Sequence, residues 1–214
     1  MTDPQFIDST ATYVRRTLAE AEGGHDWWHI HRVWHNARLI AQTEQADQLI
    51  VELAALLHDI ADSKFHNGDE EIGPQTAMAW LRSIGLDEAV VEHVGNIIRY
   101  MSFKASFKDS GFYSVEMGIV QDADRLDAIG AIGIARAFTY GGFKNREIYN
   151  PEIPPNLNMT KDEYKNSASP SINHFYEKLL LLKERMNTVT GKRLAQERHA
   201  FMVSYLDQFY KEVK

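Results

Sequence analysis

The sequence predicts an all-α protein. Apolar residues recur at spacings of three and four along most of the chain, and no segment shows the alternation of polar and apolar residues that is typical of a strand. Aspartate or serine precedes several of the periodic segments, as expected where helices begin. A chain of 214 residues is long enough to bury a substantial core. We therefore expect one helical domain spanning residues 1–214.

In the first half of the chain, each expected helix follows a residue that suits an N-cap or a first turn. The first helix begins with proline after aspartate and ends at Gly23-Gly24, since proline suits a helix start and glycine a helix end. The third is almost continuously apolar and therefore belongs in the core. The five expected helices begin at Asp3-Pro4, near Asp26, at Asp47, near Asp69 and at Asp87.

The second half predicts one long helix, an irregular segment and a helical hairpin. Ser114 caps the long helix, which is expected to continue so that Asp124, Ala128 and Ala131 share one face. Residues 141–170 contain several prolines and asparagines and are interpreted as an irregular, lid-like segment. The C-terminal helices of the hairpin are expected over residues 171–213. Ser169-Pro170 is the start signal of the first, and the second begins near Thr190.

Composition narrows the class of function. The formal net charge of -7 argues against binding to extended nucleic acid, which needs a basic face. The chain has no cysteine, which excludes disulfides, thiolate metal sites and cysteine nucleophiles and is compatible with a reducing compartment. Neither an apolar leader nor an apolar run long enough to span a bilayer is present in the sequence. We expect a cytoplasmic protein with no membrane partner.

The segment Val51–Ile60 carries a histidine and an aspartate at the end of an apolar helix. His58 and Asp59 follow seven residues of which only one is polar, so the helix carries both side chains toward the core. A buried imidazole and carboxylate must be paired or must bind a metal ion. The other His-Asp dipeptide, His25-Asp26, lies at a helix start, where Asp26 has an ordinary capping role.

Two further residues are candidates for the same site as His58-Asp59. His29 lies at the edge of the inward stripe of the second helix, and Asp124 lies on the small-residue face of the long helix, with Asp122 as the alternative. Two imidazoles and two carboxylates form a mixed nitrogen and oxygen site, which suits Mn²⁺, Fe²⁺, Co²⁺, Ni²⁺ or Zn²⁺ better than Ca²⁺. Four protein ligands leave positions open for water and substrate on an octahedral ion.

This pattern resembles the HD superfamily of metal-dependent phosphohydrolases. The family signature is a histidine, a later His-Asp pair and a distant aspartate, and it matches about residues 26–136. The phrases around these residues, and the stretch from Ile172 to Phe209, are similar to a bacterial subgroup of single-domain HD hydrolases. The resemblance implies an HD-type helical bundle that binds one divalent metal ion, with Mg²⁺ as a further possible identity. It implies the ligands His29, His58, Asp59 and Asp124.

Other polar residues near these motifs are candidates for catalysis and substrate binding. Asp62 falls one turn after Asp59, where several HD hydrolases place a residue near the attacking water, so we expect it to orient or deprotonate that water. Asp127, one turn after Asp124, is expected to hold a ligand histidine or a substrate hydroxyl. A second metal ion would use His66 and His93. The cations expected to bind an anionic substrate are Arg32, Lys64, Lys104 and Arg125.

The leading hypothesis is a metal-dependent hydrolase of phosphoric esters or anhydrides. Its expected partner is a small phosphorylated substrate, possibly a nucleotide, attacked by a metal-activated water. Two alternatives stay open: an HD-type iron oxygenase with a dinuclear site, and a non-catalytic sensor of a metal ion or nucleotide.

Overall fold

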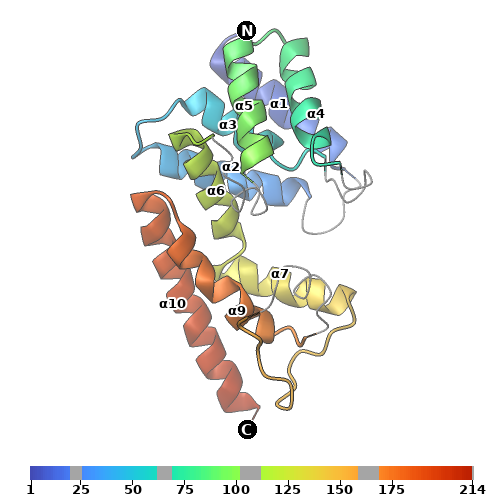
Figure 1. The fold of residues 1–214 in the computed structure, drawn as a ribbon, viewed down its shortest axis with the longest axis vertical. Coiled ribbons are helices and arrows are strands. Elements are labelled where there is room, and N and C mark those ends of the chain that lie inside the picture. Colours follow the sequence, from blue (N-terminus) through green and yellow to red (C-terminus); the bar gives the residue numbers. More distant parts are fainter. Residues whose placement is uncertain (20–25, 62–68, 102–111, 159–168, 214) are drawn as a thin grey trace. The chain divides into compact units, whose positions relative to one another are not determined.

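The computed structural model describes residues 1–19, 26–61, 69–101, 112–158 and 169–213. Within these ranges every regular element is helical, nine α-helices and one 3-10 helix, so the predicted all-α class is confirmed (Figure 1). The chain divides into two compact units, Met1–Asp124 and Arg125–Lys214.

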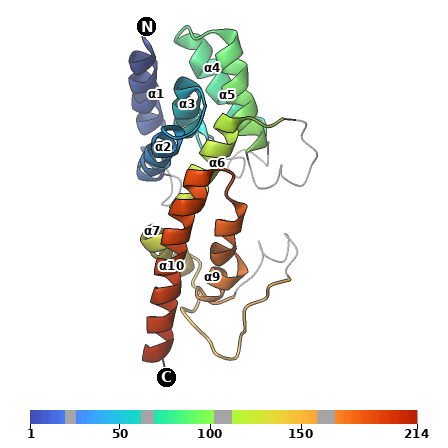
Figure 2. The same cartoon turned by 90° about the vertical axis from the view of Figure 1, so that its left-hand side faces the viewer.

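Helix α3 is the packing centre of the first unit. Every residue from Ile50 to Leu57 is buried except Glu52. Helix α3 contacts α1, α2 and α5 (Figures 1 and 2). Helix α4 packs against α5. Because α3 is apolar on all sides, burial of apolar surface from several directions holds it in place. The helices of this unit are α1 (Asp3–Thr17), α2 (Trp27–Ala41), α3 (Gln48–Leu57), α4 (Ile72–Ser83), α5 (Glu88–Tyr100) and the greater part of α6 (Val115–Asp127).

Most helix starts in this unit follow the expected capping residues. Asp26 and Asp47 are the N-caps of α2 and α3, and the Asp47 carboxylate accepts hydrogen bonds from the backbone N–H groups of Leu49 and Ile50. The expected cap at Asp3 is wrong by one residue. Thr2 is the N-cap, and the Gln5 side chain accepts a hydrogen bond from its backbone N–H at 2.9 Å. Pro4 still lies in the first turn, as expected, because the nitrogen of a first-turn residue needs no hydrogen-bond partner within the helix.

Two predicted boundaries in the first unit also differ from the structure. Helix α1 ends at Thr17, before the predicted Gly23-Gly24, which lies outside the described residues. Helix α4 begins at Ile72, three residues after the predicted start near Asp69. Helix ends are the least specified part of a periodic pattern, because the apolar spacing continues across the last turn.

In the second unit, α10 (Val189–Glu212) packs against α7 (Gly130–Phe143) and the 3-10 helix η3 (Leu179–Arg185). The predicted first arm of the C-terminal hairpin is made of two short helices, α9 (Asn173–Glu177) and η3, separated at Lys178. The apolar spacing that predicts one helix is nevertheless respected, because its members are all buried. They are Ile172, Phe175, Leu179, Leu182 and Met186.

The expected single long helix after Ser114 is wrong. Helix α6 ends at Asp127, Ile129 is extended with φ -127° and ψ 168°, and Gly130 has φ +75° at the start of α7. A positive φ interrupts a right-handed helix, and glycine adopts it without the steric cost of a Cβ atom. Asp124 and Ala131 therefore do not share a helix face.

The predicted lid-like segment is shorter at its beginning than expected. Helix α7 continues to Phe143, residues 144–158 are irregular, and residues 159–168 lie outside the described residues. Its role as a lid stays a prediction. Among the helices in the described ranges, none combines the length and the apolar character needed to cross a membrane.

Candidate metal centre

His29 enters the site from the first turn of α2. The side chain of Asp26 accepts a hydrogen bond from the backbone N–H of His29 at 2.9 Å, which fixes this turn, and the next turns bury Ile30 and Val33 completely. Capping and burial together define the direction of the His29 side chain. Asp26 thus has the capping role that the sequence predicts for it.

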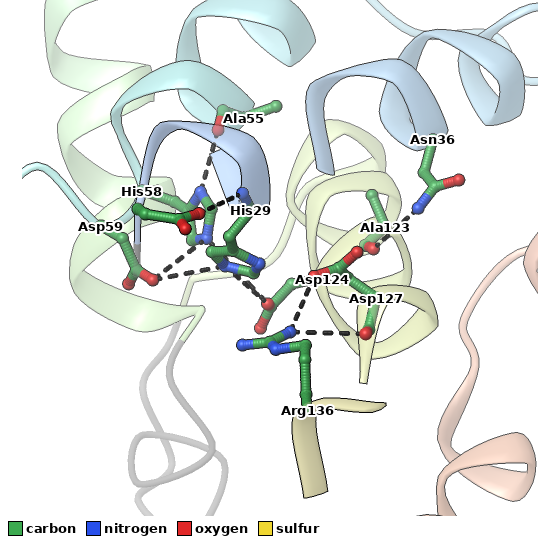
Figure 3. Close-up of polar contacts among 10 residues, drawn as sticks. His29, Asn36, Ala55, His58, Asp59, Ala123, Asp124, Asp127 and Arg136 are labelled. Atoms are coloured by element: carbon green, nitrogen blue, oxygen red, sulfur yellow. Dashed lines mark hydrogen bonds and ion pairs between the residues drawn. The ribbon is translucent and has the colours of Figure 1, made fainter. Parts of the chain in front are cut away.

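His58 and Asp59 follow the last turn of the buried helix α3. His58 is the C-cap residue, and its Nδ1 lies 2.9 Å from the carbonyl oxygen of Ala55. A carbonyl oxygen only accepts, so Nδ1 carries the proton and Nε2 presents its lone pair. This backbone contact fixes both the tautomer and the ring orientation, as for metal-binding histidines. Figure 3 shows Nε2 directed toward the carboxylates.

Asp124 comes from α6, which lies beside α2 in the first unit. The Asn36 side chain on α2 donates a hydrogen bond to the carbonyl oxygen of Ala123 at 3.5 Å, immediately before Asp124 (Figure 3). The Oδ1 atom of Asp124 is 3.6 Å from Nε2 of His29 and 4.0 Å from Nε2 of His58. Three helical segments far apart in the sequence thus bring four side chains together.

The distances in this cluster suit a shared ion better than direct hydrogen bonds. Asp59 Oδ2 is 3.5 Å from Nε2 of both His29 and His58, and these three residues place one donor atom each within 4.8 Å of one another. Direct hydrogen bonds between an imidazole N–H and a carboxylate oxygen have shorter nitrogen–oxygen distances than these. Donor atoms about 2.1 Å from one ion would be about 3.0 Å apart at right angles and about 4.2 Å apart across it. The observed separations lie between these limits.

One atom of the cluster tests directly whether a metal ion fits. Nε2 of His58 is buried, and among the residues that the structure describes it has no hydrogen-bond partner. A buried nitrogen left in this state costs free energy unless something binds it. With its proton on Nδ1, Nε2 can donate its lone pair to a cation. The donor set therefore fits a divalent ion.

The two kinds of ligand differ in exposure. The side chains of His29 and His58 are 2% and 3% exposed, whereas those of Asp59 and Asp124 are 29% and 44% exposed. A cation held by all four would have its nitrogen ligands on the buried side and its carboxylates toward solvent. The carboxylates balance the positive charge of the ion, and the exposed side leaves room for water and a substrate.

The alternative ligand, Asp122, occupies a different position on α6. It is fully buried and lies two residues before Asp124, about 200° around the helix at about 100° per residue. The contacts of Asp124 with both histidines make it the better placed of the two. Several predicted site residues lie outside the described residues: the catalytic candidate Asp62, the substrate candidates Lys64 and Lys104, and His66.

The remaining predicted residues, Arg32, Arg125, Asp127 and His93, lie within the described ranges. Arg32 is half-buried one turn after His29 on α2. Arg125 Nη1 donates to the carbonyl oxygen of Arg185 at 2.6 Å, and the carboxylate of Asp127, only 1% exposed, pairs with Arg136 at 2.7 Å. His93, the candidate for a second metal, lies 3.0 Å from the Ser114 hydroxyl at the start of α6.

The residues that support these ligands are not among those predicted from the sequence. Asn36 and the carbonyl of Ala55 hold α6 and the His58 ring, and Arg136 and Arg198 contact the end of α6. Asn36 lies three residues after Val33, near the inward stripe of the second helix. This spacing is the one sequence signal that points to Asn36 as a supporting residue. Nothing in the sequence separates Arg198 from the other polar residues of α10.

The chain is similar to known proteins over nearly its whole length. A family model described as HD domain matches residues 27–129. The protein YpgQ of Bacillus subtilis (strain 168) is 38% identical over all of this chain and 96% of its own length. The crystal structure of an HD-superfamily hydrolase from Bacillus thuringiensis is 43% identical with a TM-score of 0.79, covering 99% of this chain and 98% of that one. The crystal structure of Bacillus subtilis YpgQ in complex with ADP has a TM-score of 0.78 at 38% identity, covering 99% and 97% of the two chains.

Proposed function

Because this chain belongs to the HD superfamily, we propose that it is a metal-dependent phosphohydrolase of a small phosphorylated compound. The observation that carries the proposal is that a carboxylate oxygen of Asp59 and one of Asp124 each lie 3.5–4.0 Å from Nε2 of both His29 and His58. A divalent cation bound by His29, His58, Asp59 and Asp124 would polarise a phosphoryl oxygen and lower the pKa of a water.

The chain's own residues supply the rest of the proposed chemistry. The two buried histidines fix where the cation is held, and the partly exposed carboxylates leave one side of it open to the substrate. Asp62 is assigned to orient the attacking water and accept its proton as the phosphorus–oxygen bond to the leaving group breaks. Arg32, Lys64 and Lys104 are assigned to offset phosphate charge. For Arg125 and Asp127, the contacts at the end of α6 favour a supporting role.

Nucleotides are the substrate class that we propose to test first. The Bacillus subtilis relative was crystallised with ADP, and the two chains match over nearly their whole lengths. A nucleotide carries phosphoryl oxygens, which a divalent cation with open coordination positions binds. The acidic net charge of -7 does not oppose this, because a cation inverts the local field of one pocket.

The test is a hydrolysis assay on metal-depleted protein. Nucleoside di- and triphosphates and simple phosphomonoesters are incubated with Mn²⁺, Co²⁺, Ni²⁺, Zn²⁺, Fe²⁺ or Mg²⁺, and the release of phosphate and pyrophosphate is followed. We expect metal-dependent release that Asp124→Asn lowers at least 100-fold. Asp207→Asn, which changes an exposed aspartate on α10, is the matched control and should leave the rate unchanged.

Two outcomes would contradict the proposal. Absence of metal-dependent release from every compound would favour a binding protein, and an Asp124→Asn variant as active as the wild type would remove the site from the reaction. Metal counting on the purified protein addresses the oxygenase alternative. One ion per chain agrees with the proposed hydrolase, whereas two iron ions together with oxygen consumption would favour the oxygenase.

A further inference from the structure

The last turn of α6 carries Asp124 and then ends in a corner built from arginine contacts. The helix stops at Asp127, three residues after Asp124. The last carbonyl groups of a helix lack partners within the helix and must be satisfied from elsewhere. Here the N–H groups of Ala128 and Ile129 donate to the carbonyl oxygens of Arg125 and Leu126 at 3.2 and 3.3 Å, and two arginines donate to the carbonyl oxygens of Leu126 and Asp127.

Arg198 on α10 donates a hydrogen bond to the backbone at the end of α6. Its Nη1 donates to the carbonyl oxygen of Leu126 at 2.5 Å. Burial lowers the pKa of Arg198, although the negative charges of Asp127 and Glu197 oppose this shift. Taking a guanidinium out of water is costly unless hydrogen bonds and opposite charge compensate it. The compensation here is the C-terminal end of α6, whose carbonyl groups attract a cation.

Arg136 on α7 completes the corner. Its Nη1 pairs with the buried Asp127 carboxylate at 2.7 Å and lies 3.4 Å from the Asp127 carbonyl oxygen. The pair therefore ties the last residue of α6 to the next helix. Because Asp127 is only 1% exposed, solvent screens this pair little, and breaking it would leave a buried charge without its partner.

The backbone at the corner leaves space for Arg198. Gly130 has φ +75°, and a Cβ atom added there would lie 3.0 Å from Cγ and 3.1 Å from Cβ of Arg198. The positive φ favours glycine at this position, and a larger residue would also press against the Arg198 side chain that passes it. The corner and Arg198 fit each other, which is not expected of an arginine that merely happens to lie near a helix end.

We propose that Arg198 is a positioning residue for the metal centre. By holding the last turn of α6, it fixes the carboxylate of Asp124 one turn earlier, and so raises the affinity of the centre for a divalent cation. Arg136 acts with it through Asp127. This proposal rests on the proposed function, because it concerns the same four ligands. It assigns to the C-terminal unit a role in cation binding that is carried by the continuous helix α6.

The expected effect is moderate. Residues that orient a metal ligand typically cost 10–100-fold in metal affinity when they are changed. Arg198 acts on Asp124 through the helix backbone rather than through its carboxylate, so the lower end of that range is expected. Arg198→Met should weaken Mn²⁺ binding about 10-fold. Arg198→Lys keeps a cation near the helix end but loses the planar fork, and should fall between the wild type and Arg198→Met.

The experiment is a calorimetric Mn²⁺ titration of full-length variants. Arg193→Met is the matched control, since Arg193 lies on the same helix α10 in an exposed ion pair with Glu197. The decisive comparison adds Asp124→Asn. If Arg198 acts through Asp124, Arg198→Met should weaken binding about 10-fold in the wild type and less than twofold when Asp124 is already asparagine. A purely structural role would weaken binding equally in both backgrounds.

Each other outcome also decides the matter. Mn²⁺ affinity of Arg198→Met within twofold of the wild type overturns the positioning role while leaving the metal site standing. No Mn²⁺ binding by the wild type overturns the proposed function and this inference with it. If Arg198→Met does not fold, Arg136→Gln takes its place in the same cycle, because it breaks the Asp127 pair at the same turn. Equal losses in both backgrounds would again overturn the proposal.

Discussion

The ring of His58 is held by the backbone of the helix that precedes it, with Nδ1 2.9 Å from the carbonyl oxygen of Ala55. This contact leaves Nε2 as the atom that faces the carboxylates of Asp59 and Asp124, at 3.5 and 4.0 Å. The backbone of α3 therefore determines which nitrogen is offered to a cation. Replacing His58 by glutamine or alanine would remove the imidazole nitrogen Nε2 and its lone pair.

A first prediction follows for His58. His58→Gln should weaken Mn²⁺ binding at least 100-fold, because one of four ligands is lost and the carboxylates keep their mutual repulsion. The measurement is a calorimetric titration. His35→Gln, an exposed histidine on α2, is the control and should bind Mn²⁺ as the wild type does. Equal affinity in the two variants would exclude His58 as a ligand.

A second prediction concerns stability. A cation that binds only the folded protein stabilises it, by about 2.7 kcal/mol at a free concentration 100 times Kd. For a chain of this size the increase in Tm should be about 5–10 °C. Differential scanning calorimetry with and without Mn²⁺ measures it. Ca²⁺ should give a smaller increase, since imidazole ligands disfavour it.

The same scan on Asp124→Asn provides the check. This variant keeps the helical fold but loses one anionic ligand, so its Tm should respond less to Mn²⁺ at equal concentration. A response as large as that of the wild type would mean that the ion binds elsewhere.

A third prediction tests the core that holds the ligands. Leu56 is fully buried in α3, and Leu56→Ala should lower the free energy of unfolding by about 2–5 kcal/mol, because it removes apolar contacts and leaves a cavity. Leu39→Ala, on the exposed side of α2, should cost about 1 kcal/mol or less. Urea unfolding followed by tryptophan fluorescence compares the two. Similar losses would contradict the central place of α3.

A fourth prediction concerns pH. Burial, together with the nearby cations Lys178 and Arg146, lowers the pKa of His174 to about 4 from the ordinary value of 6.5. The unfolded chain therefore binds more protons than the folded one between these values, so His174 makes the folded state lose stability as pH falls from 6.5 to 4. From pH 7 to pH 5 this contribution is about 2 kcal/mol.

The measurement for His174 is the difference between the wild type and His174→Gln. The free energy of unfolding of the wild type should fall by about 2 kcal/mol more than that of the variant between pH 7 and pH 5. His31→Gln, which changes an exposed histidine, should follow the wild type. Parallel pH dependence of the wild type and His174→Gln would show that His174 is not the group responsible.

Local sequence signals predict the helices best where a side chain binds the backbone of its own helix. Asp26 and Asp47 cap α2 and α3 as expected, because a short carboxylate side chain satisfies free N–H groups wherever it precedes an apolar periodic segment. The inward residues of the C-terminal arm were also predicted, although the backbone there forms α9 and η3 rather than one helix. Burial depends on the spacing of apolar residues more than on the exact helix type.

The break between α6 and α7 shows where local signals fail. The small residues from Ala128 to Ala131 are compatible with a continuous helix, and glycine there costs only about 1 kcal/mol against alanine. The decision comes from long-range contacts, in which Arg198 and Arg136 bind the carbonyl groups that a continuing helix would have used. A residue about 70 positions away leaves no trace in the local pattern.

Periodicity, capping and the chemistry of histidine and aspartate are local properties. They therefore predict the helical class, the core helix α3 and the residue types of a mixed nitrogen and oxygen site. Helix packing in the folded chain is needed to bring the carboxylates of Asp59 and Asp124 to 3.5–4.0 Å from the imidazole nitrogens of His29 and His58, and to place Arg198 and Arg136 at the end of α6 one turn after Asp124. The physical reason is that these relationships depend on helix packing, which joins residues far apart in the chain through burial and desolvation rather than through neighbouring side chains.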